Sequence, residues 1–405
     1  MTVAPLDYFS AEYHANPPAV YARAREQAPV HEGPALDGTG GRAWHVLRYA
    51  DILSVLKDQS IVRHAPGLEV AADFSLADPV ALFSALSRQS LLFNDPPNHT
   101  RLRALVGAAF TPRMIAGLGA RVEAVTEELL DAAARRGSLD IVHEYALPLT
   151  LTVIAEMLGV PPADQPLLSQ WAFTLVRAVD CKRTTDIYGQ AIATSIEIFG
   201  YFAELLTRKR AEPSGDLLSQ LVMAEDQEGR LNEQELIITA TTLLMAGHET
   251  TVNLIGNGAL LLLQHPDQLR LLRERPALIT TAVEEFLRYH APAQITSRYA
   301  LRDLAIGSAV IPAGMMVNLA LGSGNHDPAA FTDPERCDIT RTGPRHLAFG
   351  MGMHYCVGAP LARLEASIAI PRLIARFPTL RIAQPEPVWR DTISFRGLDR
   401  LDTLW

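Results

Sequence analysis

Apolar residues recur every three or four positions through the middle of the chain, the spacing that lines one face of an α-helix. The longest such segment starts at Asn232, a good N-cap residue, and Glu235 three positions later completes a capping box. The pattern predicts helices over residues 118–136, 147–158, 187–210, 216–223, 232–263, 266–274, 276–289 and 358–377.

Strand signals are fewer and lie near the two ends of the chain. Short apolar runs bounded by glycine and proline predict strands, and these fall at residues 44–48, 295–300, 304–306, 309–311 and 316–319. No internal repeat or linker divides the sequence. We therefore expect a mainly α fold with a small β region, folded as a single domain over residues 1–405.

Charge and apolar content restrict the class of protein. The 405 residues carry 36 basic and 45 acidic side chains, a net charge of −9, which argues against nucleic-acid binding. The most apolar stretch, residues 236–263, is interrupted by His248, Glu249, Asn253 and Asn257, as in a buried helix rather than a membrane span. The first 25 residues lack the apolar core of a secretion signal. We expect a soluble cytoplasmic protein.

The three cysteines, Cys181, Cys337 and Cys356, form no C-x-x-C pair, so neither a structural zinc site nor a disulfide framework is indicated. Cys356 lies in the glycine-rich segment FGMGMHYCVG, which starts at Phe349. Glycine lets a flat group approach the backbone closely, and the positive end of a following helix favours thiolate over thiol. Taken alone, a single cysteine is more often a buried structural residue.

The ten-residue segment resembles the haem-binding loop of the cytochrome P-450 superfamily, Phe-x-x-Gly-x-(Arg/His)-x-Cys-x-Gly. The resemblance implies haem b between the long central helix and the helix after the cysteine, with the Cys356 thiolate as the axial metal ligand. It extends over nearly the whole chain, because other family motifs follow in the expected order. The cofactor contacts that it implies are His99, Arg103, Ala246, Arg298, His346, Phe349, Gly350, His354, Cys356 and Gly358. Of these, the resemblance places His99, Arg103, Arg298 and His346 at the haem propionates.

Glu285 and Arg288 match the family's Glu-x-x-Arg motif and share one helix face. By the resemblance they form a buried structural network with Arg336. On spacing alone, the pair could equally be a weak surface ion pair.

The segment AGHETT, residues 246–251, lies midway along the longest predicted helix and resembles the family's oxygen-binding groove. A threonine hydroxyl can bond to the carbonyl four residues earlier, here from Thr250 to Ala246, and loosen the helix. The resemblance implies that Thr250 hydrogen-bonds dioxygen and that Glu249 relays protons, because a buried site needs a defined proton path. A helix merely rich in threonine is the alternative interpretation.

The family implies a monooxygenase that inserts one atom of O2 into a small molecule. The substrate should be medium-sized and largely apolar, for instance a natural-product intermediate. No flavin or iron–sulfur motif is present, so a ferredoxin or flavodoxin with its reductase should supply electrons. The arginines of this chain that we expect to bind this redox partner are Arg101, Arg113, Arg363 and Arg372. The substrate-pocket candidates are Leu92, Leu243, Ala246, Gly247, Ala293, Ile295, Thr296 and Phe395.

Three other functions remain open on the sequence. A peroxide-driven peroxygenase would not need the Glu249–Thr250 relay, and a non-enzymatic haem sensor could dispense with it. A cysteine hydrolase would need a base within hydrogen-bond reach of Cys356 and an orienting group. His354 is only two residues away and no hydrolase-like context surrounds it, which argues against this function. The acid–threonine pair favours the monooxygenase.

Overall fold

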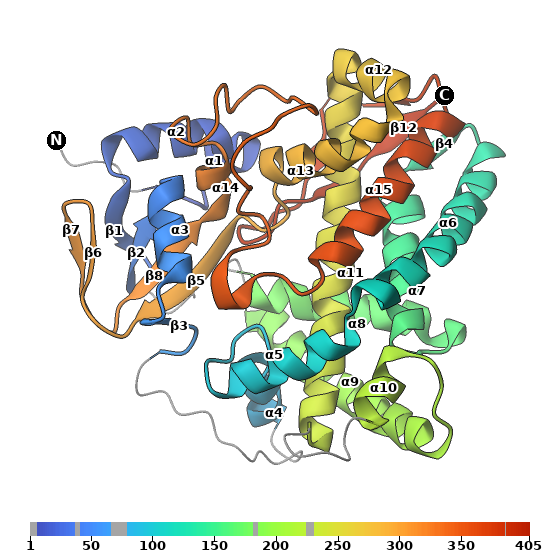
Figure 1. Cartoon of the computed structure of the whole chain (residues 1–405), viewed down its shortest axis with the longest axis horizontal. Helices are drawn as coiled ribbons and strands as arrows, with labels where there is room; N and C mark the ends of the chain where they lie inside the picture. The colour runs from blue at the N-terminus through green and yellow to red at the C-terminus, as the bar shows by residue number, and fades with distance from the viewer. Residues whose placement is uncertain (1–5, 37–40, 66–78, 181–184, 224–230, 385) are drawn as a thin grey trace.

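The fold of the chain comes from a computed structural model that describes residues 6–36, 41–65, 79–180, 185–223, 231–384 and 386–405. Most of it is helical, with a small β region at one end (Figure 1). The helices are α1 Ala11–Ala15, α2 Pro17–Gln27, α3 Tyr49–Lys57, α4 Pro79–Arg88, α5 Asn98–Ala109, α6 Pro112–Ala134, α7 Leu147–Met157, α8 Gln165–Val179, α9 Thr185–Ala211, α10 Leu217–Met223, α11 Glu233–Gln264, α12 Pro266–Glu274, α13 Ile279–Tyr289, α14 Leu321–Asn325 and α15 Ala359–Arg376.

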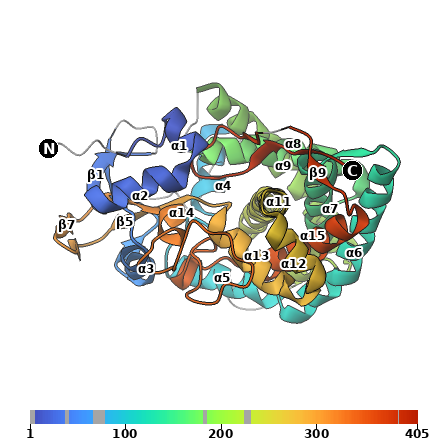
Figure 2. The same ribbon diagram turned by 90° about the horizontal axis from the view of Figure 1, so that it is seen from above.

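Helix α11 runs through the middle of the helical part, where the other helices surround it (Figures 1 and 2). Its predicted capping box is confirmed: the Asn232 side chain accepts from the Glu235 amide at 2.9 Å, and the Glu235 carboxylate accepts from the Asn232 amide at 3.0 Å. Most of the helix is buried, including Glu249, Asn253 and Asn257. Among the residues described, no helix is both long and apolar enough to cross a membrane.

The main sheet has the order β1–β2–β8–β5–β3, with β2 and β8 parallel and the other pairs antiparallel. A hairpin of β6 and β7 projects beside it (Figure 1). The C-terminal strands form a small sheet β10–β11 and, together with β4 from the first half of the chain, the sheet β4–β12–β9. The strands are β1 Val30–Pro34, β2 Arg42–Val46, β3 Ile61–Val62, β4 Ser138–Asp140, β5 Ile295–Ala300, β6 Leu304–Ile306, β7 Ala309–Ile311, β8 Met316–Ala320, β9 Arg381–Ile382, β10 Val388–Trp389, β11 Leu398–Arg400 and β12 Asp402–Leu404.

The predicted mainly α fold with a small β region is confirmed, and the bounds of α12, β5, β6 and β7 agree with the prediction residue for residue. Helix α8 was not predicted, although Leu168, Trp171 and Leu175 stand at helical spacing and are buried. Three prolines, Pro161, Pro162 and Pro166, cluster at its start and favour a turn there. The two-residue strands were also missed, because so short a segment has no period of its own.

Candidate active site

Cys356 lies in the long loop between α14 and α15, three residues before α15 begins. Its amide donates to the carbonyl of Phe349 at 3.0 Å, which closes the loop. Burial raises the pKa of the Cys356 thiol, while the amides of Gly358 and Ala359 and the charge of Arg103 lower it. The predicted helix start behind the sulfur is confirmed, and two backbone N–H groups point at the atom where a thiolate charge would form.

Two of the loop glycines have backbone conformations that other residues rarely adopt. Gly350 has φ 66° and Gly352 has φ 72°, and a Cβ at Gly352 would collide with the carbonyl oxygen of Leu56. Gly358 has an ordinary φ of −81°. The loop therefore depends on glycine at the first two positions to fold tightly against α3.

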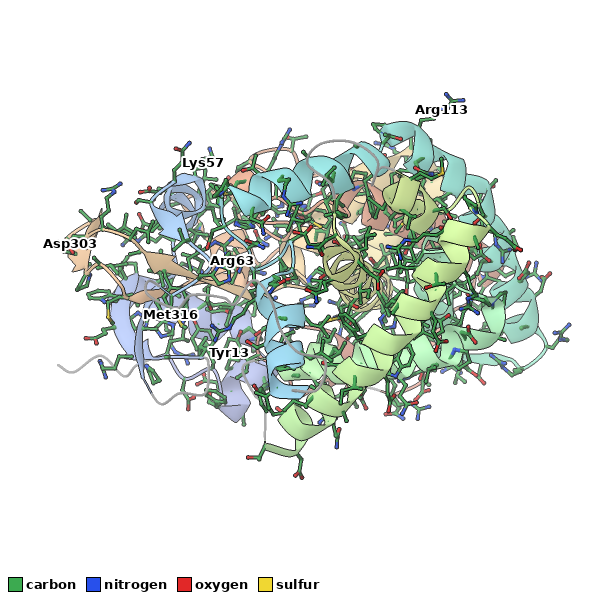
Figure 3. The ribbon with its side chains drawn as sticks, turned by 90° about the horizontal axis from the view of Figure 1, so that it is seen from below. Tyr13, Lys57, Arg63, Arg113, Asp303 and Met316 are labelled. Atoms are coloured by element: carbon green, nitrogen blue, oxygen red, sulfur yellow. The ribbon has the colours of Figure 1, made fainter. Side chains whose placement is uncertain are left out.

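Basic side chains from four separate segments meet near the cysteine loop. His99 and Arg103 come from α5, Arg298 from β5, Arg63 from the segment after β3, and His354 from the loop itself. The rings of His99 and His354 lie 4.1 Å apart between centroids, and Arg103 is close enough to act on the Cys356 sulfur. Figure 3 shows Arg63 in the middle of the molecule rather than at its edge.

The side chains of Arg63 and Arg298 share the same two acceptors. Their Nη1 atoms donate to the Thr296 hydroxyl at 3.1 and 2.8 Å and to the Ser297 carbonyl at 3.2 and 2.8 Å. The Asp95 carboxylate fixes the segment of Arg63 by accepting its amide at 2.9 Å, and it also contacts the His64 ring at 3.1 Å. The half-buried Thr296 hydroxyl and the Ser297 carbonyl thus hold the two arginines side by side.

This cluster has more positive than negative charge. Among the residues described, Asp95 is the one carboxylate that acts on Arg63 and Arg298, and it already contacts His64. Burial lowers the pKa of Arg298 to about 10 and that of His354 to about 2. Buried charges need partners, so the cluster is suited to bind further anionic groups. The two propionates of a haem beside Cys356 would supply them, and the residues present fit that cofactor.

His346, also expected at a propionate, has another partner here. Its Nε2 lies 3.3 Å from a Glu284 carboxylate oxygen, and its Nδ1 accepts from the Ala348 amide at 3.1 Å. Glu284 also binds Arg363 at 2.6 Å, and the Arg363 guanidinium lies over the Phe349 ring, 4.6 Å from its centroid. Glu284 thus connects the start of the cysteine loop with α15, while the propionate role of His346 stays a prediction.

On α11, the Thr250 hydroxyl donates to the Ala246 carbonyl at 2.8 Å, as predicted. The helix nevertheless continues unbroken through residues 246–251. Ala246 is exposed in the middle of this otherwise buried helix, so α11 borders open space there, and Thr250 is half-buried. Glu249 is buried and forms an ion pair with Arg390, the residue just after β10, which no sequence motif indicated.

The Glu-x-x-Arg pair is a buried ion pair, with both side chains 2% exposed and Arg288 Nε 2.7 Å from the Glu285 carboxylate. The prediction that Arg336 supplies the third side chain is wrong. Arg341 binds Glu285 at 3.1 Å instead, and Arg336 contributes only its carbonyl, which accepts from Arg341 at 2.8 Å. The loop has no regular period, so spacing could not tell the two arginines apart.

Several substrate-pocket candidates have other contacts. The Thr296 hydroxyl is occupied by the two arginines, and a Cβ at Gly247 would lie 3.1 Å from the Ile154 side chain of α7, so Gly247 makes room for that helix. Ala293 and Phe395 are joined by an isolated β-bridge. Leu243 and Ile295 are buried, and Leu92 is 42% exposed. The pocket itself remains a prediction.

Three of the four expected docking arginines are neutralised by nearby carboxylates. Arg101 pairs with Glu235, Arg363 with Glu284, and Arg372 with both Glu123 and Glu127. Arg113 is exposed, and Figure 3 shows it pointing outward at one end of the molecule. The surface is thus largely a mixed-charge face rather than a strongly positive patch.

The comparisons with known proteins agree with this geometry. A family model described as cytochrome P450 matches residues 195–390. Cytochrome P450 107B1 of Saccharopolyspora erythraea is 44% identical over 94% of this chain and 93% of its own. The 6-deoxyerythronolide B hydroxylase of the same organism is 40% identical over 99% of this chain and 98% of its own.

Solved structures are also similar. The structure of P450BioI in complex with acyl carrier protein ligated to hexadec-9Z-enoic acid has a TM-score of 0.91, with 37% identity, and the match covers 98% of this chain and 100% of that one. At this level of identity over almost its entire length, the chain belongs to the cytochrome P450 family and is one of its monooxygenases.

Proposed function

We propose that Cys356 is the axial thiolate of a haem b and that the chain uses this haem to oxidise a medium-sized, largely apolar small molecule. The observation that carries the proposal is the placement of the sulfur: it lies before the N-terminus of α15, with the amides of Gly358 and Ala359 directed at it. A hydrogen-bonded thiolate in such a place is a suitable ligand for haem iron.

Arg63, Arg103 and Arg298 would hold the propionates, with His99 and His354 beside them. The supporting observation is that these arginines carry more positive charge than the nearby carboxylate neutralises. Charge-assisted hydrogen bonds to the haem carboxylates would neutralise the remaining charge. His99 is 2% exposed and its Nε2 has no partner among the residues described, so it offers a free hydrogen-bonding atom.

When bound, the haem would supply dioxygen activation, which needs two electrons and two protons. The proton steps are assigned to Thr250 and Glu249. The Thr250 hydroxyl donates to Ala246, so its oxygen can accept a hydrogen bond from water, and a small rotation of its hydrogen turns it into a donor toward the space beside Ala246. Glu249, one position earlier, can exchange protons with that water.

The relatives support the substrate class. They include a 6-deoxyerythronolide B hydroxylase and a vitamin D(3) 25-hydroxylase, and a structural neighbour is in complex with myristic acid. The molecules in these names, 6-deoxyerythronolide B, vitamin D(3) and myristic acid, are largely apolar. Electrons would come from a ferredoxin or flavodoxin with its reductase.

The test of ligation is the difference spectrum of the reduced, haem-containing chain with carbon monoxide. The wild type should show the strongly red-shifted Soret band of a thiolate-bound haem, and Cys356→Ser should lose it. Cys337→Ser is the matched control, since Cys337 is also a free cysteine in the described part of the chain, and it should keep the band. A wild-type spectrum without the band would contradict the proposal.

A further inference from the structure

The turn between β10 and β11 carries Phe395, one of the residues predicted to line the substrate pocket. The backbone on both sides of Phe395 is bonded to the segment that precedes β5. The Ser394 carbonyl accepts from the Gln294 amide at 2.8 Å, and the Arg396 amide donates to the Pro292 carbonyl at 2.8 Å. These bonds fix one edge of the turn.

Side chains from two helices hold the same turn. From α11, the side-chain amide of Asn257 donates to the Arg396 carbonyl at 3.0 Å. From the end of α8, the Asp180 side chain reaches the other part of the turn. Its Oδ2 atom accepts from the amides of Ile393 and Ser394 at 3.1 and 2.8 Å, and the residue is 2% exposed. Both helices are thus joined directly to the backbone that carries Phe395.

The local structure of α8 gives no reason for an aspartate at this position. Asp180 ends the helix in an extended conformation, with φ −70° and ψ 151°. A carboxylate there faces the negative end of the helix dipole, which is unfavourable. Burying a charge costs further free energy unless hydrogen bonds compensate for the lost water. The two amides of the turn provide that compensation, so the contact with the turn accounts for the aspartate.

We propose that Asp180 is a positioning residue that fixes the place of the Phe395 side chain and thereby decides how an apolar molecule lies beside Thr250. Without the carboxylate, the bond from Asn257 and the backbone bonds to the segment before β5 remain. The turn should therefore shift rather than unfold, and the phenyl ring should move with it while the Cys356 loop is untouched. The inference rests on the proposed function, which places the substrate pocket at these residues.

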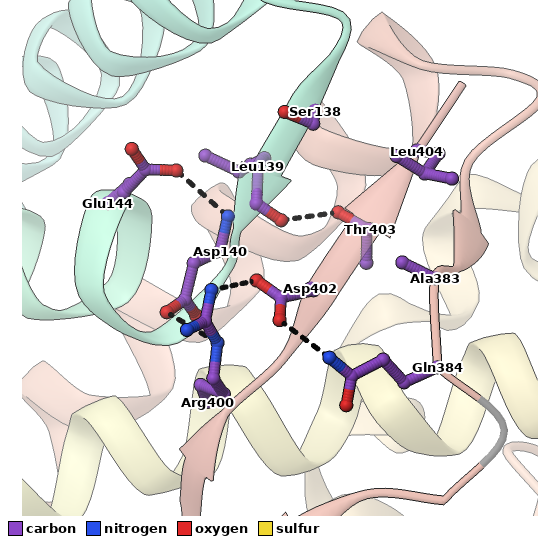
Figure 4. A pocket seen from close by; sticks show the side chains of 10 residues that line it. All are labelled: Ser138, Leu139, Asp140, Glu144, Ala383, Gln384, Arg400, Asp402, Thr403 and Leu404. Carbon is purple, nitrogen blue, oxygen red and sulfur yellow. Dashed lines mark hydrogen bonds and ion pairs between the residues drawn. The ribbon is translucent and has the colours of Figure 1, made fainter.

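Asp140 offers a matched control at the opposite end of β11. Its side chain is 10% exposed, and its carboxylate accepts from the amides of Leu401 and Val142 at 3.1 and 3.0 Å. It therefore also holds the C-terminal segment through backbone amides. Figure 4 shows Asp140 at a surface pocket with Arg400 beside it. Asp140→Ala removes comparable bonds at a place where no predicted pocket residue lies.

Optical titration of the haem-containing chain with two ligands separates positioning from general destabilisation. Imidazole binds haem iron alone, whereas 1-dodecylimidazole also brings an alkyl chain into the pocket. Asp180→Ala should weaken binding of 1-dodecylimidazole about tenfold, the effect of one lost apolar contact, and leave imidazole within about twofold. Asp180→Asn can place its one oxygen where Oδ2 stands, so it should bind both ligands as the wild type does. Asp140→Ala should also match the wild type.

A double variant tests whether the effect passes through the phenyl ring. If Asp180 acts by placing Phe395, Asp180→Ala combined with Phe395→Ala should bind 1-dodecylimidazole as Phe395→Ala does, because coupled residues are not additive. Additive losses would overturn the proposal. Equal weakening of both ligands in Asp180→Ala would overturn it as well, since that pattern indicates general damage to the fold.

Hydrogen exchange gives a readout that needs no bound ligand. The amides of Ile393 and Ser394 should exchange about tenfold or more faster in Asp180→Ala, because each loses a charge-assisted hydrogen bond. They should be unchanged in Asp140→Ala. Equal exchange in wild type and Asp180→Ala would show that the carboxylate does not hold the turn. A wild-type chain without the red-shifted Soret band would instead refute the proposed function, and the exchange rates would still decide whether Asp180 fixes the turn.

Discussion

The position of the Arg63 side chain is set by residues that are far away in the sequence. From the sequence, it could equally have faced the substrate pocket or solvent. Its guanidinium instead lies beside Arg298, and both share the hydroxyl of Thr296, a residue more than two hundred positions away. Like charges placed side by side in a buried region need negatively charged partners. We therefore assign Arg63 to the cofactor rather than to the substrate.

Replacing Arg63 by glutamine should weaken haem retention. One charge-assisted hydrogen bond contributes about 1.5–3 kcal/mol, so haem should transfer to an acceptor protein roughly tenfold or more faster. Arg177→Gln is the control, because Arg177 is an exposed arginine on α8. Equal transfer rates in the two variants would show that Arg63 does not bind the propionates.

At the scale of elements, buried Glu285 joins α13 to the irregular loop that precedes the cysteine segment. Its carboxylate binds Arg288 on the same helix and Arg341 from the loop, and it accepts the Asp338 amide at 2.9 Å. Arg341 in turn donates to the Thr332 carbonyl at 2.6 Å. The network gives a loop without secondary structure a defined path toward Cys356.

In this network Arg341 and Arg336 should contribute differently to the free energy of unfolding. Arg341→Met should lower the free energy of unfolding by about 2–3 kcal/mol, less than the full loss of a buried pair because Arg288 still neutralises Glu285. Arg336→Met should change it by about 0.5 kcal/mol at most, since Arg336 is exposed and uses only its carbonyl. Urea unfolding measures both values, and equal losses would contradict the assignment.

At the scale of the whole molecule, the net charge of −9 says little about how a redox partner docks. Ion pairs neutralise most of the arginines expected to form a positive patch, so local geometry decides which charges an acidic partner can reach. Arg113, exposed at one end of the molecule in Figure 3, remains accessible. The opposite end carries the β6–β7 hairpin with Asp303.

Charge reversal at Arg113 should therefore slow reduction by a ferredoxin about two- to fivefold at low salt, and it should flatten the dependence of the rate on salt. Arg302→Glu is the control, because Arg302 is also exposed and adjoins Asp303 at the opposite end (Figure 3). Stopped-flow reduction of the two variants tests the docking face. If Arg113→Glu is reduced as fast as Arg302→Glu, docking must occur elsewhere.

Features that depend on neighbours along the chain could be predicted from the sequence. The capping box before α11, the bounds of α12 and the Thr250–Ala246 bond are local, because helix geometry alone brings their atoms together. The cysteine loop belongs to the same class, since its glycines and the helix behind it are adjacent in sequence.

Only the tertiary structure decided which distant side chains meet. The sharing of Thr296 by Arg63 and Arg298, the ion pair of Glu249 with Arg390, and the choice of Arg341 over Arg336 all join segments that no period relates. Their physical basis is burial: charges removed from water must find partners wherever the fold brings them. The sequence by itself therefore indicated the family and the kind of chemistry, while packing decided which distant side chains surround Cys356 and hold its loop in place.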